Sequence, residues 1–337
     1  ENVRIIRILE RANTTLTGTL KRSRMFYYII PDDPRIIQDI LVPDPRQAKV
    51  SPKPKVDDKV VVRLDPWEQR HLNPEGVIIE VLGKTHTPMA EYEALLRQYD
   101  LSPDFSESVL KEVSGFSAKV GETDRQDRTD IRDLFTLTID PQDAKDFDDA
   151  LSMQISENGN VVVGVHIADV SHYVRPGTAL DREARKRGNS TYLVGTVIPM
   201  LPKALSNGLC SLVEGEDRLT KSVFIEYAPT GKVLSSRFAN TVICSDKRLT
   251  YEQAYAFLFE DDLEEIQSRP DPPAHQTGST GRSLKELRRK ELKKIQGTIR
   301  KLWDLASRVR KHRVMKGSLE LDMPETKIYV DKAGYAD

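Results

Sequence analysis

The sequence predicts an α+β protein of two modules: a small antiparallel β-barrel or sandwich, followed by a mixed α/β module. Short strand-like segments separated by Pro, Gly, Asn and Asp fill residues 1–86. Strand and helix patterns alternate over the rest of the chain. The 337-residue length also suits about two domains with sizeable cores.

Composition excludes some classes of protein. The chain has 51 Lys and Arg against 52 Asp and Glu, so any nucleic-acid surface must come from a local patch. Cys210 and Cys244 lie in apolar stretches, without a neighbour at metal-ligand or redox spacing. We find no apolar run of about eighteen residues and no signal peptide, and we therefore expect a cytoplasmic protein without a membrane segment.

The segment LTGTLKRSRMFYYIIPDD places basic residues beside aromatic ones in the first module. These residues are Lys21, Arg22, Arg24, Phe26, Tyr27 and Tyr28. In an OB-type barrel, basic groups follow phosphates and aromatic faces stack on bases, at roughly 1–3 kcal/mol per base. Alternatively, two of the aromatic residues lie in the core and the basic residues form a solvated rim. The residues alone leave both interpretations open.

Elements of the second module can be placed from their patterns. Helical residues over 87–118 predict a connector, and LFTLTID predicts a strand that ends at Asp140 on its more polar face. VVVGVHIADV alternates little, as a strand buried on both faces does. A hairpin is expected with its turn at residues 229–232. Ser283 and Glu286 predict a capping box that opens a long helix.

Five aspartates lie within TIDPQDAKDFDDA, directly after the strand that ends at Asp140. Their mutual repulsion opposes folding unless water or a cation surrounds them. A calcium loop of the helix-loop-helix kind is excluded, because Gln142 and Ala144 occupy ligand positions and the central Gly is missing. An aspartyl nucleophile of a phosphatase would need one carboxylate rather than several.

Two interpretations of the acidic segment stay open from the residues alone. A solvated turn is the common fate of such a run, and Asp-Pro often opens a turn. A magnesium site also needs carboxylate oxygens, and two ions about 3.5–4 Å apart can assist an in-line phosphoryl displacement. Asp140, Asp146, Asp148 and Asp149 provide a strand-end ligand and a short loop that can fold around such ions.

A longer stretch resembles a known catalytic module. TIDPQDAKDFDDA, followed by VGVHIADVSHYVRPGTALDREARKRGNSTYLVGTVIPMLPKALSNGLCSL, resembles the ribonuclease II (RNB) family, and within it the bacterial ribonuclease R group. Residues 14–86 resemble a cold-shock domain, an OB-type barrel that binds RNA. Residues 1–13 resemble the end of a preceding one, and residues 119–337 the first part of an RNB module. Nearly the whole chain is covered.

The resemblance implies an activity and a metal site. Family members degrade RNA processively from the 3′ end to nucleoside 5′-monophosphates, with magnesium as cofactor; manganese is the alternative ion. Metal binding and catalysis then fall on Asp140, Asp146, Asp148 and Asp149. Asp143 is outside this set and is expected to be a surface charge.

Substrate contacts follow from the same resemblance. In family members, a Tyr in the segment here reading GNSTYLVG packs against the 3′-terminal nucleotide, which indicates Tyr192. A stacked ring holds any base. The alternative is that Tyr192 packs in the core near the Pro199 and Pro202 turns. We expect a monomer that binds the 3′ end of single-stranded RNA.

Other polar residues are expected to be structural. His166 and His172 flank IADVS, but magnesium prefers oxygen ligands. Asp169 is expected to accept hydrogen bonds from local backbone groups. Cys210 is expected to be a small core residue.

A complete family member continues for several hundred residues and carries an Arg-rich motif near the scissile phosphate, which stabilises developing charge. This chain begins at Glu1 without Met and ends at Asp337, so we expect a fragment that hydrolyses RNA poorly. Two alternatives are a non-catalytic RNA-binding protein with a degenerate RNB scaffold, and a metal-dependent phosphohydrolase of small nucleotides. The complete aspartate set argues against the first, and the attached barrel against the second.

Overall fold

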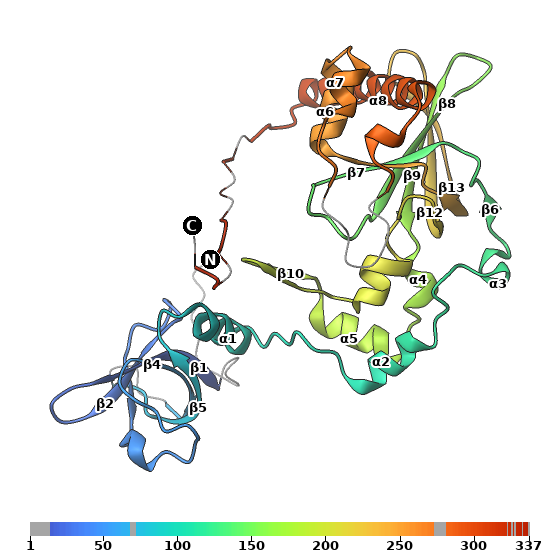
Figure 1. Cartoon of the computed structure of the whole chain (residues 1–337). Coiled ribbons are helices and arrows are strands. Elements are labelled where there is room, and N and C mark those ends of the chain that lie inside the picture. Colours follow the sequence, from blue (N-terminus) through green and yellow to red (C-terminus); the bar gives the residue numbers. More distant parts are fainter. Residues whose placement is uncertain are drawn as a thin grey trace, which may run out of the picture. The chain divides into compact units, whose positions relative to one another are not determined.

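The computed structural model of the chain is shown in Figure 1. It describes residues 14–67, 72–272, 281–321, 323–324, 326, 328–331 and 333–335. The expectation for residues 1–13 lies outside these described residues. Two compact units are present. The first contains the described residues up to Asp104, the Thr191–Ile198 hairpin and the described residues after Glu325; the second contains the remainder.

The first unit is built on a five-stranded antiparallel sheet with the strand order β3-β2-β1-β4-β5. Its elements are β1 Thr15–Arg22, β2 Tyr27–Pro31, β3 Ile40–Val42, a 3-10 turn Pro45–Gln47, β4 Asp58–Leu64, β5 Gly76–Lys84, α1 Pro88–Gln98, β10 Thr191–Leu193 and β11 Thr196–Ile198. Leu41 in β3 bridges to Glu75, just before β5, so the two edges of the sheet meet. The expected small barrel is confirmed.

Alternating side chains of the barrel strands form its core. The buried members are Leu16, Leu20, Ile29, Ile40, Val42, Val60, Val62 and Ile78. Gly18 is required in β1, because a Cβ there would lie 2.4 Å from the carbonyl oxygen of Ile30. The buried Lys59 ammonium contacts Asp32 at 2.7 Å and Glu91 at 2.9 Å, and thereby attaches α1 to the barrel.

The second unit contains a mixed seven-stranded sheet with the order β14-β7-β8-β9-β12-β13-β6. Its elements are α2 Glu107–Ser114, α3 Glu122–Arg125, β6 Thr129–Asp130, β7 Thr136–Asp140, β8 Asp149–Ile155, β9 Val161–Ala168, α4 Val170–Tyr173, α5 Ala179–Arg187, a π-helical turn Leu205–Leu209, β12 Asp217–Tyr227, β13 Val233–Cys244, β14 Lys247–Thr250, α6 Tyr251–Phe259, α7 Leu263–Gln267, a 3-10 turn Leu284–Glu286 and α8 Arg289–Met315. The expected mixed α/β module is confirmed.

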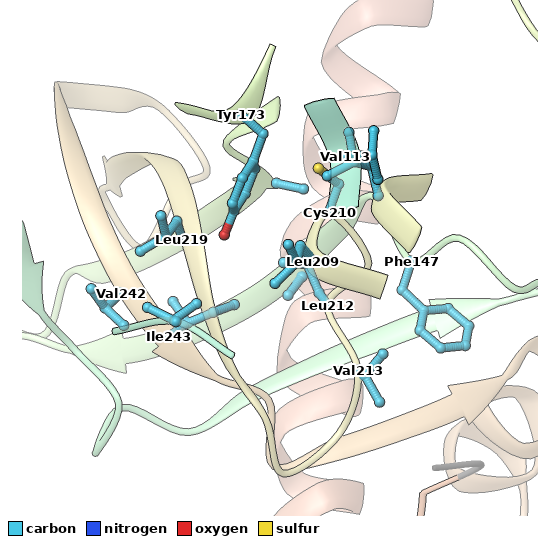
Figure 2. Close-up of a cluster of buried hydrophobic side chains, with 14 of the residues drawn as sticks. Val113, Phe147, Tyr173, Leu209, Cys210, Leu212, Val213, Leu219, Val242 and Ile243 are labelled. Atoms are coloured by element: carbon cyan, nitrogen blue, oxygen red, sulfur yellow. The ribbon is translucent and has the colours of Figure 1, made fainter. Parts of the chain in front are cut away.

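Two hydrophobic clusters stabilise this sheet. One joins β7 and β14 to α6, α7 and α8, which lie together in Figure 1. The other contains Phe147, Tyr173, Leu209 and Cys210, and Figure 2 shows its side chains. No helix in the described part of the chain is long and apolar enough to cross a membrane.

Two local predictions can be compared with the structure. The β12–β13 turn is confirmed, since the amide of Ala228 donates to the carbonyl of Lys232 at 2.9 Å. Ser283 and Glu286 do form a capping box, but they open a 3-10 turn rather than the long helix. That helix, α8, begins at Arg289. The 3-10 turn ends at Glu286, and the extended backbone of Leu287 separates it from α8.

Candidate active site

The predicted aspartates gather at one end of the β7–β8 pair. Asp140 is the last residue of β7 and Asp149 the first of β8, and Leu137 of β7 pairs with Leu151 of β8. Residues 141–148 connect the two strands and are called the acidic loop below. The carbonyl of Asp148 accepts a 3.0 Å hydrogen bond from an amide at the end of β9, which attaches the end of this loop to the sheet.

Asp140 is partly buried, and one of its carboxylate oxygens, Oδ2, is buried without a hydrogen-bond partner. Desolvation first, and then the negative charge of Asp149, raise the pKa of Asp140 to about 7, while Arg248 and the Thr138 side chain act in the opposite direction. Burying a carboxylate oxygen without a partner costs free energy. A bound divalent cation would satisfy this oxygen.

The remaining aspartates lie nearer to solvent. Asp148 and Asp149 are exposed and Asp146 is partly exposed. Desolvation first, and then the charges of Asp146 and Asp149, raise the pKa of Asp148. These carboxylates therefore lie within electrostatic reach of one another. Asp143 is exposed, as expected for a surface charge.

This donor set fits a hard cation in chemistry but does not form a closed cage. Carboxylate oxygens are what magnesium prefers, and such sites usually keep waters and add substrate phosphate. Among the described residues, no three or more His, Cys, Asp or Glu side chains are gathered closely enough to hold a metal ion. The arrangement is therefore open, with the unsatisfied oxygen of Asp140 as its most buried donor.

One positive charge faces this end of the sheet, and sequence reasoning missed it. Arg248 in β14 is 2% exposed, and the parallel register with β7 pairs it with Thr138, two residues before Asp140. Burial lowers the pKa of Arg248, and the negative charge of Asp140 opposes this shift. A charged pair, Lys247 and Arg248, directly before apolar Leu249 was the available signal.

Phe147 of the acidic loop and Cys210 belong to one buried hydrophobic cluster, and Figure 2 shows both side chains. Phe147 is 1% exposed although aspartates flank it on both sides. Burial raises the pKa of the Cys210 thiol to about 12, and the Asp148 charge contributes to this shift. The thiol therefore stays protonated, as expected for a core residue.

Tyr192 lies in the β10–β11 hairpin, where it pairs with Val197. Its side chain is 69% exposed, so the alternative of a tyrosine packed in the core is wrong. The hairpin groups with the first unit and the aspartates lie in the second. Stacking of Tyr192 on the terminal nucleotide stays a prediction.

The basic and aromatic residues of the barrel lie on β1, β2 and the turn between them. Phe26 is exposed, and its ring centre lies 5.9 Å from that of Tyr28. Arg22 and Arg24 are exposed, whereas Lys21 forms a 2.8 Å ion pair with Asp57. Tyr27 is partly buried and packs against the barrel core, and Tyr28 is also partly buried, so the alternative of core aromatics with a solvated basic rim stays open.

Two further residues have structural roles. His166 is fully buried between Ser222 at 2.7 Å and Ser152 at 2.9 Å, as expected for a structural histidine. Asp169 was expected to bind local backbone groups, but its carboxylate accepts a 2.6 Å hydrogen bond from the Arg128 guanidinium. Arg128 comes from a segment far away in sequence, so local patterns could not identify it as the partner.

Comparisons with known proteins match both units. The RNB domain family matches residues 128–336, and the cold shock domain family matches residues 28–106. Ribonuclease R of Thermotoga maritima is 43% identical over 257 residues, which cover 76% of this chain and 36% of that protein. The chain spans 32% of the length of ribonuclease R of Vibrio parahaemolyticus and 57% of the length of ribonuclease R of Acidithiobacillus ferrooxidans.

Solved structures show the same arrangement of elements. The Mycoplasma genitalium RNase R complex with double-stranded RNA aligns with a TM-score of 0.78 at 25% identity, and covers 99% of this chain and 54% of that chain. Yeast Ssd1, a pseudonuclease, aligns with a TM-score of 0.62 at 21% identity, and covers 81% of this chain and 36% of that chain. The second likeness shows the fold alone.

Proposed function

The chain belongs to the RNB domain family, and from this membership we propose that it forms part of a processive, magnesium-dependent 3′–5′ exoribonuclease. The products are nucleoside 5′-monophosphates. We place the protein in the cytoplasm, as a monomer. The relatives named ribonuclease R, about 40% identical over most of this chain, support the reaction class.

One observation carries the proposal: a partly buried carboxylate at the end of β7 that has an unsatisfied oxygen and acidic neighbours. Asp140 has this position, and burial, followed by the charges of Asp149 and Asp148, raises its pKa. A solvated acidic turn would not bury a carboxylate oxygen without a partner. The open arrangement of the other carboxylates matches ions that keep waters and bind substrate phosphate.

Asp140, Asp146, Asp148 and Asp149 would hold magnesium, or manganese in its place. When bound, the cation supplies Lewis-acid chemistry for phosphodiester hydrolysis. The chain's own contribution is to hold these carboxylates at one end of a rigid sheet and to bury Phe147 beneath them. A scaffold that fixes donors before substrate arrives lowers the reorganisation needed during reaction.

RNA contacts are assigned to two surfaces. Tyr192 would stack on the 3′-terminal nucleotide, which its exposure permits. The barrel residues Lys21, Arg22, Arg24, Phe26 and Tyr28 would contact single-stranded RNA upstream of that end. Exposed cations and tilted rings on one strand pair favour phosphate contact and base stacking without sequence preference.

A non-catalytic RNA-binding protein is the second candidate. The absence of a ready metal cage in the described part of the chain favours it. The presence of all four predicted aspartates argues against it, since a scaffold without chemistry has no need to keep four repelling charges together.

A degradation assay distinguishes these functions. A 5′-labelled single-stranded RNA is incubated with magnesium and with this chain, with a protein of the relatives' length that contains it, and with the Asp148→Asn variant of that protein. The nuclease is supported if the longer protein shortens the RNA to very small products and its Asp148→Asn variant does not. Binding without shortening, in magnesium and in manganese, supports the scaffold. We expect little turnover from the 337-residue chain alone, and robust turnover would contradict that expectation.

A further inference from the structure

We propose that Arg248 and Ser211 are positioning residues that clamp the acidic loop, residues 141–148, in the shape that presents its carboxylates to metal ions. The inference rests on the proposed function, because it concerns the same site. Neither side chain belongs to the predicted metal-ligand set. Both act on the loop through its backbone and through one buried ring.

Arg248 holds the first half of the loop from β14. Its Nη2 donates to the carbonyl of Gln142 at 3.1 Å and lies 3.5 Å from the carbonyl oxygens of Pro141 and Ala144. The guanidinium also lies 4.7 Å from the centre of the Phe147 ring. These three carbonyls converge on one planar guanidinium, which fixes the turn that contains them. The ammonium of a Lys, on its flexible side chain, would fix this turn less well.

Ser211 holds the second half from the segment after the π-helical turn Leu205–Leu209. Its Oγ accepts a 2.9 Å hydrogen bond from the amide of Phe147 and donates to the carbonyl of Lys145 at 3.3 Å. The amide of Leu212 donates to the carbonyl of Phe147 at 2.8 Å. Because Ser211 is fully buried, water cannot readily replace its hydroxyl.

The two anchors meet at Phe147, between Asp146 and Asp148. Phe147 is buried, whereas Asp146 is partly exposed and Asp148 is exposed, so the buried ring separates two carboxylates that face away from the core. A slip of one residue would exchange the ring for a carboxylate in the hydrophobic cluster. Arg248 on the ring and Ser211 on the backbone both oppose that slip.

Arg248 also brings a permanent positive charge to the acidic loop and its two flanking strand ends, which together carry five carboxylates over residues 138–150. Its Nε is buried without a hydrogen-bond partner, as is Oδ2 of Asp140. An arginine placed here offsets part of the carboxylate repulsion before any ion binds. The loop can therefore keep its shape in the metal-free protein, and a prebuilt site binds ions more tightly than one that must first be ordered.

The first test measures hydrogen exchange of the loop amides in the metal-free chain. Arg248→Met and Ser211→Ala should each speed exchange of residues 142–147 by about tenfold or more, because each removes buried hydrogen bonds. Exchange in β12 and β13 should not change. The matched control is Arg237→Met: this exposed guanidinium also lies over a ring, 3.9 Å from the centre of Phe224, but touches no part of the loop.

The second test measures Mn²⁺ affinity of the same proteins by titration calorimetry. Arg248→Met and Ser211→Ala should bind roughly 10–100-fold more weakly, as is typical when groups that orient ligands are lost. The Mn²⁺ affinity of Arg248→Lys should lie between that of these two variants and that of wild type, because Lys keeps the positive charge but lacks the planar set of guanidinium donors. If Arg248→Met does not fold, the loop hydrogen exchange and the Mn²⁺ affinity of Arg248→Lys and Ser211→Ala test the proposal instead.

The outcomes separate this inference from the proposed function. Loop exchange that stays at the wild-type rate in Arg248→Met and Ser211→Ala overturns the clamp. Equal Mn²⁺ affinity in wild type and both variants overturns it as well, while the proposed function stands. A wild-type protein that binds no Mn²⁺ overturns the proposed function, and with it the purpose that we assign to the clamp.

Discussion

The Lys247 ammonium donates a 2.9 Å hydrogen bond to the Glu214 carboxylate, and both side chains are almost completely buried. Glu214 also accepts from the backbone amides of Arg248 at 2.9 Å and Arg282 at 3.1 Å. Burial lowers the pKa of Lys247, and the charge of Glu214 opposes that shift. The pair attaches β14 to the segments before β12 and α8, and so fixes the strand from which Arg248 reaches the acidic loop.

Breaking this pair should destabilise the second unit. Glu214→Gln keeps the shape but leaves the buried Lys247 ammonium without its counter-charge, which typically costs about 3–5 kcal/mol. Urea unfolding followed by circular dichroism measures the free energy of unfolding. The control is Asp304→Asn, which removes an exposed ion pair with Arg308 and should change stability by less than about 1 kcal/mol. Equal small effects of both changes would contradict the prediction.

Replacing Asp140 should stabilise the metal-free protein at alkaline pH. Its pKa is raised from 3.8 to about 7 in the folded state, so the folded protein favours the protonated carboxyl. The stability that this carboxyl confers is complete below about pH 4 and is lost as the pH rises through about 7. The Asn side chain cannot ionise, so Asp140→Asn does not lose stability as the pH rises. At about pH 8 with EDTA, its free energy of unfolding should exceed that of wild type by up to about 4 kcal/mol.

Urea unfolding of both proteins at about pH 5 and pH 8 measures this difference. The advantage of Asp140→Asn should shrink at the lower pH. Asp143→Asn is the matched control, because Asp143 is an exposed aspartate of the same loop. A constant difference between Asp140→Asn and wild type across this range would count against the raised pKa.

The buried His166 should have the opposite pH dependence. Burial lowers its pKa from 6.5 to about 4, so the folded state favours the neutral ring. Its contribution to stability is therefore complete above about pH 6.5 and is lost as the pH falls through about 4, by up to about 3 kcal/mol. His166→Gln should show a smaller loss of unfolding free energy between about pH 7.5 and pH 4.5. His312→Gln, an exposed position on α8, should behave like wild type.

Tyr192→Ala should weaken binding of RNA 3′ ends by roughly 1–3 kcal/mol, the usual contribution of one stacked base. Tyr192→Phe should bind like wild type, because stacking needs the ring rather than the hydroxyl. Fluorescence anisotropy in the Asp148→Asn background measures affinity without degradation. If Tyr192→Ala binds as tightly as Tyr192→Phe, the ring does not hold the terminal nucleotide.

Replacing the basic and aromatic residues of the barrel should weaken RNA binding and its salt dependence. The set is Lys21, Arg22, Arg24, Phe26 and Tyr28. Loss of three cations should reduce the slope of log affinity against log salt by about 2, at about 0.7 for each phosphate contact in a single strand. Hydrolysis of a dinucleotide should hardly change. An unaltered slope would show that RNA does not use this face.

Much of the architecture could be predicted, because it follows from local patterns of apolar, polar and turn-forming residues. The strand ending at Asp140 follows from alternation in LFTLTID, and the β12–β13 hairpin from its turn residues. The start of α8 was harder to predict, since the Ser283 capping box is real but serves a separate turn. Local hydrogen bonds specify a cap without specifying how far the helix continues beyond it.

The candidate site likewise has features that the sequence predicts and features that only the tertiary structure shows. The aspartate spacing after β7 and the resemblance to the RNB family come from contiguous residues, so the sequence by itself determined which carboxylates to consider. Only the tertiary structure decided which cation faces them, because Arg248 lies 106 residues from Gln142 and reaches it through the β7–β14 register. Likewise, the fold alone buries Phe147 against Ser211. Burial and long-range pairing set the charge balance of the site, and neither is a property of any short stretch of sequence.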